Sequence, residues 1–234
     1  MSTEAPKRFY KQAGIHEDGG GFGVALDGRA VKTPAGADFR VPSRALAKAC
    51  AQEWTAQGER ILFATMPLTR LAYAAIDHAP ANRESMADHV AKYGETDLVC
   101  HRVETPAALA KRQAAAWDPA LTFAATFEIK PPLVVGVIQA NVSPEAVAAL
   151  RAHALSLDNF RLTALAQATG ATGSALIALA LAHGQFDGAT AFNAATVDEH
   201  WSLETWGDDA EARARLEKVR IDIEALARFV AALS

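Results

Sequence analysis

Short extended segments separated by turn residues occupy the first forty positions of the chain. The segments with strand-forming composition are 8–15, 22–26, 30–33 and 39–41. Three glycines at 19–21 mark the turn after the first segment, because glycine tolerates positive φ. Asp27-Gly28 is typical of a two-residue hairpin, and Pro34 with Gly36 marks the next turn. This pattern predicts a small antiparallel meander.

Apolar residues recur at helical spacing after position 42. Leu46, Cys50 and Trp54 fall at i, i+4 and i+8, so they share one face of a predicted helix. Ser43 can cap this helix, and Gly58 can end it in the left-handed conformation. We interpret Trp54 as a packing residue of the buried face, between the helix and the strands.

Proline and cap residues divide the next stretch into two further helices. Pro67 suits the first turn of a helix that should stop before Pro80, because proline cannot continue a helix without losing a hydrogen bond. Asn82 can cap a third helix that runs to Tyr93, with Gly94 beyond its end.

From position 105 onward the pattern predicts helices almost throughout. Thr105-Pro106 and Ser143-Pro144 are each a cap followed by proline at the first helical position. Pro119 should kink or break the helix that contains it. The other expected elements are a β-branched run at 134–138 and helices over 159–168, 174–183, 189–206 and 209–233.

These elements predict an α+β protein with a small β-rich N-terminal domain followed by a larger all-α helical domain. We place the boundary between residues 1–85 and 86–234. The longest apolar run, 175–182, is far shorter than the roughly 20 residues of a spanning helix. We therefore expect a core helix there and no membrane insertion.

Composition narrows the class of protein further. Half of the 234 residues are hydrophobic, the net charge is −4, and no basic run is present, so we expect no nucleic-acid partner. The N-terminus lacks the apolar segment of a secretory signal, which favours the cytoplasm of a bacterium. Cys50 and Cys100 are expected to be buried thiols, although a single disulfide between them stays open.

Patterns of catalysis and cofactor binding are missing from the sequence. The glycines at 19–23 lack the Gly-Lys-Ser/Thr ending of a phosphate loop and precede a strand. The histidines and cysteines lack zinc-site spacing, so we expect no metal, no cofactor and no catalytic residue. Cys100 beside His101 leaves a small cytoplasmic enzyme as one alternative. A permanent structural subunit of a larger complex is the other.

Several motifs together resemble a known family. They are Leu26-Asp27-Gly28-Arg29, Val31-Lys32-Thr33-Pro34, Val41-Pro42-Ser43, Glu53-Trp54 with Ala56-Gln57-Gly58, Met66-Pro67-Leu68-Thr69-Arg70-Leu71, Ala75-Ile76-Asp77, Tyr93 with Thr96-Asp97-Leu98 and Cys100, Gln113 with Trp117-Asp118-Pro119, and Asp198-Glu199 with Trp206-Gly207-Asp208-Asp209. In order and spacing the chain resembles the alpha-subunit assembly chaperone of the catalytic (F-one) sector of ATP synthase, the Atp-twelve family. The resemblance spans about residues 8–230.

The resemblance implies a function in protein binding and ATP synthase assembly. Such a chaperone binds the unassembled alpha subunit and shields the surface that will face beta, which would otherwise aggregate. It is displaced when alpha pairs with beta, so nucleotide hydrolysis is unnecessary. We expect a monomer. The sequence leaves the client-binding surface, the affinity and the release trigger open.

The resemblance also indicates the client-binding residues. It singles out Glu199 of the Asp198-Glu199 pair, and we add Trp201 and Trp206 as aromatic anchors nearby. The family often continues with an acid, an aromatic residue and Gln, whereas this chain has His200-Trp201-Ser202. Because the additional acid and amide are absent, Glu199 is the main candidate for client contact. The alternative interpretation is that Glu199 is only a solvated carboxylate on the helix surface.

Overall fold

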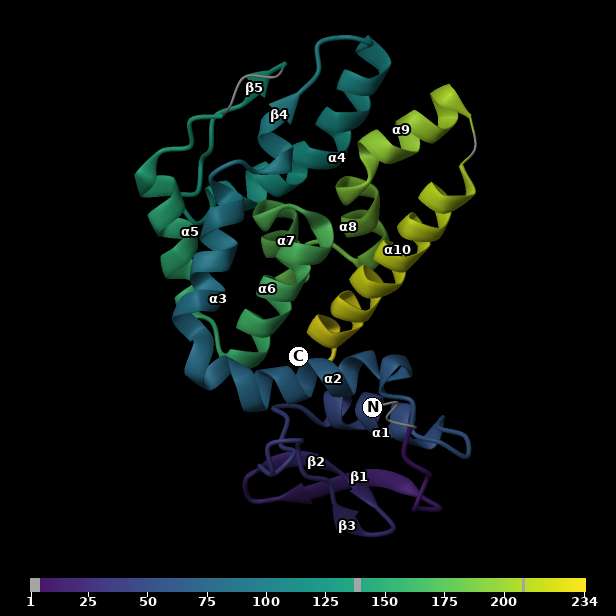
Figure 1. The fold of residues 1–234 in the computed structure, drawn as a ribbon. Helices are drawn as coiled ribbons and strands as arrows, with labels where there is room; N and C mark the ends of the chain where they lie inside the picture. Colours follow the sequence, from purple (N-terminus) through teal and green to yellow (C-terminus); the bar gives the residue numbers. More distant parts are fainter. Residues whose placement is uncertain (1–4, 137–139, 208) are drawn as a thin grey trace.

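The computed structural model describes residues 5–136, 140–207 and 209–234. A small sheet lies at one end of the molecule, covered by α1 (Arg44–Thr55), and helices build the remainder (Figure 1). The expected α+β class is confirmed. Of the β-branched run expected over 134–138, residues 134–136 are described and 137–138 lie outside the described residues.

The sheet is an antiparallel meander of β1 (Ala13–Asp18), β2 (Gly21–Leu26) and β3 (Arg29–Ala30). Asp27 and Gly28 have φ values of 47° and 81°, so the dipeptide forms the predicted two-residue hairpin. The pairing register joins Leu26 to Arg29.

Three of the expected strand boundaries were wrong. The first strand begins at residue 13 rather than 8, because Arg8 donates its N–H to the Glu59 carbonyl and follows a loop instead. The third strand keeps only two residues, since the turn at 34–36 folds the chain back. The segment 39–41 contributes a single bridge between Val41 and Phe22.

Helix α1 begins as its sequence predicts. The Ser43 hydroxyl accepts the N–H of Leu46, and Leu46, Cys50 and Trp54 are all buried. The expected left-handed end at Gly58 was wrong, because α1 already ends at Thr55 and Gly58 keeps an ordinary φ.

One helical path continues from α2 into α3. Helix α2 (Pro67–Tyr73) begins at proline as expected, then passes through a π-helical turn, η2 (Ala74–His78), into α3 (Ala79–Gly94). The expected stop before Pro80 was wrong, because Pro80 lies in the first turn of α3, where its missing N–H is tolerated. Asn82 marks a kink with φ −125°, and its side-chain amide donates to the His78 carbonyl rather than capping a helix.

Helices form most of the remaining chain. They are α4 (Ala107–Ala125), α5 (Pro144–Ser156), α6 (Asn159–Thr172), α7 (Ala175–Ala182), α8 (Gly188–Ala195), α9 (Val197–Trp206) and α10 (Ala210–Ala231). Short 3-10 turns, η1 (Phe63–Thr65) and η3 (Leu98–Cys100), and a parallel pair, β4 (His101–Arg102) with β5 (Val134–Val135), complete the described fold.

The predictions for Pro106, for Pro119 and for the helix over 189–206 were wrong. Pro106 is the N-cap residue of α4 rather than its first helical residue, and α4 continues through Pro119, so no break occurs there. Ser143 caps α5 as expected. The single helix expected over 189–206 is two, because Thr196 leaves the helical region at φ −127° between α8 and α9.

Two hydrophobic clusters form the core. One surrounds α7, whose eight residues are all buried, and the other lies between the sheet, α1 and α2. Phe229 and Val230 of α10 belong to the second cluster, and the Ser43 hydroxyl donates to the Ala232 carbonyl. The C-terminal helix therefore packs onto the N-terminal part. The domain boundary at 85, which falls within α3, stays a proposal.

Candidate client-binding site between α9 and α10

A groove of about 360 Å³ separates α9 from the first turns of α10. Gly207 creates the bend at its end, with a φ of 103° that favours glycine. Asp209 then starts α10 by accepting the N–H groups of Glu211 and Ala212. The two helices diverge from this bend at the edge of the molecule (Figure 1).

Asp198, Glu199 and Trp206 all line this groove. Helical spacing explains why they share the groove. Trp206 follows Asp198 and Glu199 by about two helical turns, so all three side chains lie near one face of α9. Trp201 is not among the lining residues, so the structure brings together three of the four side chains that the sequence indicated.

The half-buried Asp198 is held in place by a buried glutamine. Its carboxylate accepts a hydrogen bond of 2.8 Å from the side-chain amide of Gln113, which is 1% exposed. The Gln113 carbonyl oxygen in turn accepts the N–H of Val103 at 3.0 Å. This chain of bonds links α9 to α4 and the loop before it, so Asp198 has a structural task besides its place in the groove.

Glu199 contrasts with its neighbour. It is exposed, and its carboxylate forms no hydrogen bond or ion pair with the residues that the structure describes. A carboxylate that the fold does not use keeps its full capacity to accept charge-assisted hydrogen bonds from a partner.

Trp206 is the last residue of α9, and 84% of its surface is exposed. This is the highest exposure among the large hydrophobic side chains described in the structure. A tryptophan in water keeps a large apolar area that only a partner can bury. Leu203 extends the apolar lining of the groove toward Trp206.

Trp201 packs in a different direction. It is half-buried against the larger hydrophobic cluster, and the Arg112 guanidinium lies 4.9 Å from the centre of its ring. Arg112 also forms an ion pair of 2.7 Å with Glu204. This cation–π contact joins α4 to α9, so Trp201 stabilises the position of α9 in the unbound protein.

The structure adds Arg215 and Ala212 of α10 to the groove. The sequence analysis did not select them, because only the bend at Gly207 determines which face of α10 approaches α9. Arg215 is exposed and forms no ion pair with a described residue, so the groove offers both signs of charge around an apolar centre.

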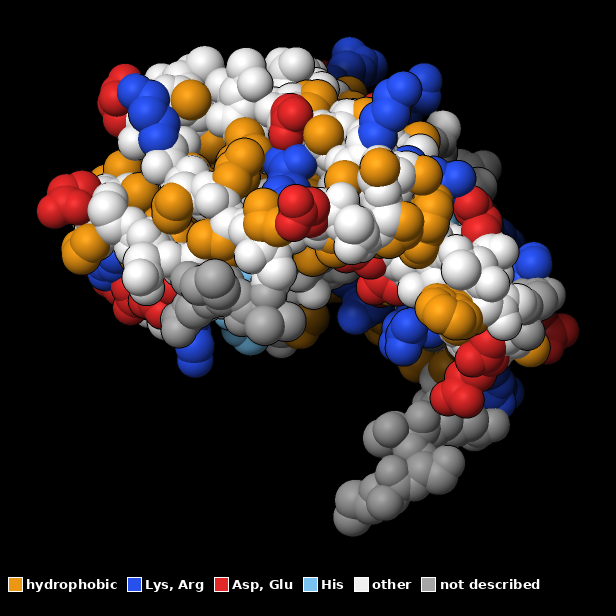
Figure 2. Space-filling view, turned by 90° about the horizontal axis from the view of Figure 1, so that it is seen from above, with side chains coloured by type: hydrophobic (Ala, Val, Ile, Leu, Met, Phe, Trp, Pro, Cys, Tyr) orange, Lys and Arg blue, Asp and Glu red, His pale blue; other side chains and the backbone are white. Residues whose placement is uncertain are grey.

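Charges on the face seen from above the α4 and α9 end are scattered. Figure 2 shows Lys and Arg side chains separated from one another, with acidic and apolar side chains between them. This distribution contrasts with the clustered basic surface that binds nucleic acid.

The Cys100–His101 alternative has poor chemistry for catalysis. Cys100 is buried, and burial raises the pKa of its thiol to about 12, which suppresses the nucleophilic thiolate. Cys50 is likewise a free thiol whose pKa burial raises to about 12. The expectation of two buried thiols is confirmed.

The metal-site, phosphate-loop and membrane-span patterns can also be compared with the structure. Among the described residues no group of three or more His, Cys, Asp or Glu side chains is arranged to hold a metal ion. Gly19 and Gly20 form the turn between β1 and β2, and Gly21 is the first residue of β2. No helix of the described chain is long and apolar enough to cross a membrane.

Comparison with known proteins places this architecture in one class. Residues 7–125 match the family model described as ATP12 chaperone protein. The crystal structure of Atp12 from Paracoccus denitrificans is 37% identical and superimposes with a TM-score of 0.90, covering 98% of this chain and 99% of that one. A mutant of P. denitrificans Atp12p matches at 36% identity and a TM-score of 0.90, covering 98% of each chain.

A third solved structure, the Atu1473 protein from Agrobacterium tumefaciens, is 37% identical with a TM-score of 0.87. It covers 98% of this chain and 87% of that one. The fold and these relatives define a chaperone. The chain belongs to the ATP12 chaperone family, as its motifs indicated, and it serves the assembly of ATP synthase.

Proposed function

We propose that this protein binds the unassembled alpha subunit of the catalytic sector of ATP synthase and shields its interface until alpha pairs with beta. The observation that supports this most is the α9–α10 groove, where the unpaired Glu199 carboxylate stands beside the exposed Trp206. The protein acts as a monomer in the bacterial cytoplasm and catalyses no reaction.

The groove combines the two properties that a chaperone surface needs. Trp206 supplies a rigid apolar anchor, and aromatic anchors of this kind are typically worth about 2 kcal/mol or more at the centre of an interface. Glu199 and Arg215 flank it with opposite charges, which select the orientation of the partner.

Asp198 and Trp201 assist by holding α9 against α4. Their contacts with Gln113 and Arg112 fix the position of α9 before the client arrives. A preformed site loses less conformational entropy on binding than a flexible one. We therefore assign direct client contact to Glu199 and Trp206, and a supporting role to the other two.

Release requires no bound nucleotide. A client held by a groove of this size stays bound only while the competing surface of beta is absent, because mass action then favours the alpha–beta pair. This mechanism also separates a chaperone from a permanent subunit, which would remain in the finished enzyme.

The test is an affinity purification of the tagged protein from cells that lack beta. Free alpha is expected to be retained, and the retained fraction should fall when purified beta is added. Light scattering of the isolated protein should give the mass of one chain. Co-purification with the finished ATP synthase, without release by beta, would assign the protein to a permanent subunit instead.

A further inference from the structure

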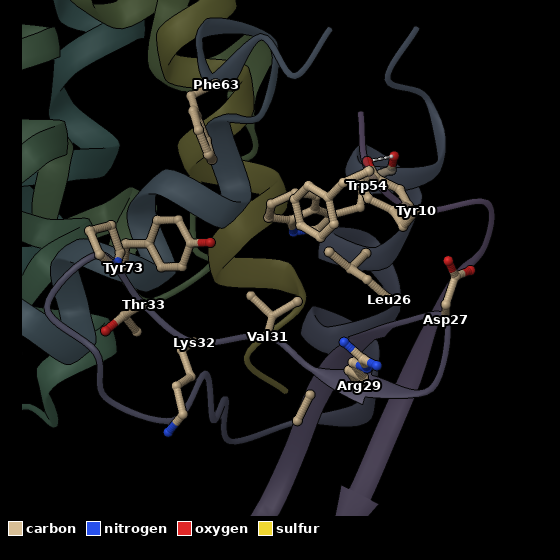
Figure 3. Close-up of a pocket in the computed structure, with 13 residues that line it drawn as sticks. Tyr10, Leu26, Asp27, Arg29, Val31, Lys32, Thr33, Trp54, Phe63 and Tyr73 are labelled. Carbon is tan, nitrogen blue, oxygen red and sulfur yellow. Dashed lines mark hydrogen bonds between the residues drawn. The ribbon is translucent and has the colours of Figure 1, made fainter. Parts of the chain in front are cut away.

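The N-terminal sheet carries a second and larger pocket, of about 800 Å³, at the other end of the molecule. Five aromatic side chains contribute to its lining, namely Phe9, Tyr10, Trp54, Phe63 and Tyr73. Figure 3 shows Leu26 and Val31 pointing into this space from the sheet, with Phe63 approaching from the opposite side.

The aromatic lining is only partly covered by the fold. Phe9 is 74% exposed and Phe63 is 39% exposed, although Phe63 packs edge-on against Trp54 with ring centres 6.0 Å apart. Solvent-exposed phenylalanines beside a pocket mark a surface that gains free energy when another molecule covers it.

Two polar side-chain groups of the same pocket have no partner among the described residues. The Trp54 side chain is 4% exposed, and its indole N–H is buried without an acceptor among the described residues. The Tyr73 hydroxyl points into the space between Val31 and Trp54, where it makes no hydrogen bond with a described residue (Figure 3). Buried polar groups in native proteins are nearly always paired, so the Trp54 N–H is a donor that the acceptor of a bound molecule would satisfy.

The wall formed by residues 29–34 offers backbone groups as well. Val31 donates its N–H to the Val24 carbonyl at 2.8 Å and accepts the Phe39 N–H at 3.1 Å. The next residue, Lys32, uses neither its N–H nor its carbonyl within the described chain. Because successive residues of an extended strand direct these groups to opposite edges, Lys32 presents them at the open edge of the sheet.

Positive charge lies along this wall. Arg29 is exposed and its side chain forms no ion pair or hydrogen bond with the described residues. Lys32 is paired with Asp38 at 2.9 Å. The acidic side chain of the lining, Asp27, already accepts the N–H groups of Lys11 and Gln12. Arg29 is therefore the cationic side chain of this wall that no described residue pairs.

We propose that this pocket is a second client-binding site, which takes an extended segment of the client chain. The segment carries a bulky apolar side chain, which fills the aromatic lining, flanked by an Asp or Glu that pairs with Arg29. Its backbone adds to the open edge at Lys32, as in recognition by strand addition. This inference rests on the proposed function, because the occupant is a segment of the alpha subunit.

Two linked sites have a consequence for client retention. The aromatic pocket and the α9–α10 groove lie at opposite ends of the molecule, so one client chain that reaches both is held more tightly than either site alone would hold it. Loss of the aromatic pocket alone should then weaken binding without abolishing it, because the α9–α10 groove still holds the client.

The experiment uses full-length protein and alpha subunit purified from cells that lack beta. A photoactivatable p-benzoylphenylalanine is placed at Phe63 or Phe9, and at Leu133, another exposed apolar residue, as the matched control. Crosslinks to alpha are expected from the two pocket positions and not from Leu133. Peptide mapping should locate them in an apolar segment flanked by Asp or Glu.

Affinity measurements complete the test. The Phe9→Ser/Phe63→Ser double variant should bind alpha about tenfold or more weakly, because aromatic anchors dominate interface energies. Arg29→Glu should also weaken binding, while Arg29→Lys should preserve most of it. Thermal melts of each variant exclude unfolding as the cause, and Phe63→Leu, which keeps an apolar side chain, should restore part of the affinity.

The outcomes separate the two proposals. If the wild-type protein does not retain alpha, both the proposed function and this pocket assignment fall. If it retains alpha, while the pocket positions give no crosslinks and the folded double variant binds with unchanged affinity, the pocket assignment is overturned and the proposed function stands.

Discussion

The carboxylate of Glu53 in α1 accepts a hydrogen bond of 2.8 Å from the backbone N–H of Leu68 in α2. Its second oxygen accepts the N–H of Thr69, also at 2.8 Å. Glu53 is 8% exposed, so a buried negative charge satisfies the free N–H groups at the start of α2, where the helix dipole favours it. Helix α1, which covers the sheet, is held to α2 through this carboxylate.

Replacing Glu53 with Gln should destabilise the protein by about 2 kcal/mol, since charge-assisted bonds are lost and a buried donor is introduced. Urea denaturation measures the change. Glu59→Gln, at an exposed glutamate a few residues away, should stay within about 0.5 kcal/mol of wild type. Equal midpoints for both variants would show that the buried carboxylate is dispensable.

Trp54→Ala should damage folding. The ring is buried against Tyr10 and Phe63, and removing a buried tryptophan typically costs about 3–5 kcal/mol. The variant should melt early and accumulate poorly in cells. Trp206→Ala is the matched control, because that side chain is mostly exposed and its removal should leave the melting temperature nearly unchanged. A wild-type melt for Trp54→Ala would contradict a packing role.

The stability of the protein should fall in mild acid because of His153 and His183. Their Nε2 atoms lie 2.8 Å apart. Burial lowers the pKa of each below the ordinary value of 6.5, with further lowering by His183 for His153 and by Arg161 for His183. The unfolded chain therefore binds more protons than the folded one as pH falls through 6.5, which destabilises the fold there and leaves full stability above it.

Denaturation midpoints between pH 7.5 and 5 would measure this effect, and His183→Gln should flatten the pH dependence. His78→Gln is the control, because His78 is exposed and directly precedes α3. This variant should keep the wild-type dependence of the midpoint on pH. If both variants keep the wild-type slope, the acid sensitivity arises elsewhere in the protein.

Local signals in the sequence predicted local structure well. Ser43 and Ser143 cap their helices, and Asp27-Gly28 forms its hairpin, because each signal acts within a few residues. Gly58 and Asn82 behave otherwise, since the end of α1 and the start of α3 depend on packing between distant segments. The Glu53 contact with α2 illustrates why, because a buried cap that comes from another helix leaves no local pattern.

The sequence indicated which residue types form the candidate site, but it did not indicate how their side chains are arranged. The sequence indicated Glu199 and Trp206 through motifs, and the structure places both in one groove. It could not distinguish Asp198, which Gln113 holds from a helix 85 positions away in sequence, from its neighbour Glu199. The contribution of Arg215 depends on how α10 leaves the bend at Gly207, which is a property of tertiary packing.

Asp198 and Glu199 should therefore respond differently to truncation. Asp198→Ala leaves the buried amide of Gln113 without an acceptor and should cost about 1–3 kcal/mol of stability. Glu199→Ala should change stability by less than about 0.5 kcal/mol, because its carboxylate has no partner among the described residues. Asp198→Asn, which keeps an acceptor oxygen, should recover most of the loss. Urea titrations of the three variants test the assignment, and a stability loss confined to Glu199→Ala would reverse it.

Glu199→Lys should leave the fold intact and abolish retention of alpha. The side chain is exposed at the mouth of the groove, so reversing its charge removes no internal contact and should change stability by about half a kcal/mol. At the interface the same change places an ammonium group where the client is expected to offer a cation. Like charges opposed at a desolvated contact cost several kcal/mol, which is enough to lower affinity by more than about a hundredfold.

The matched control for this reversal is Glu95→Lys, since Glu95 is also exposed and unpaired among the described residues but lies after α3, outside the groove. Both variants should melt like wild type by circular dichroism, whereas only Glu199→Lys should fail to keep alpha soluble in cells that lack beta. Because the two substitutions change net charge equally, a difference between them cannot come from the overall charge of the protein. If Glu199→Lys melts normally and still keeps alpha soluble, Glu199 is a solvated helix carboxylate and the groove binds through Trp206 alone. If it unfolds, the carboxylate belongs to the internal packing of α9, and the surface that contacts the client lies elsewhere.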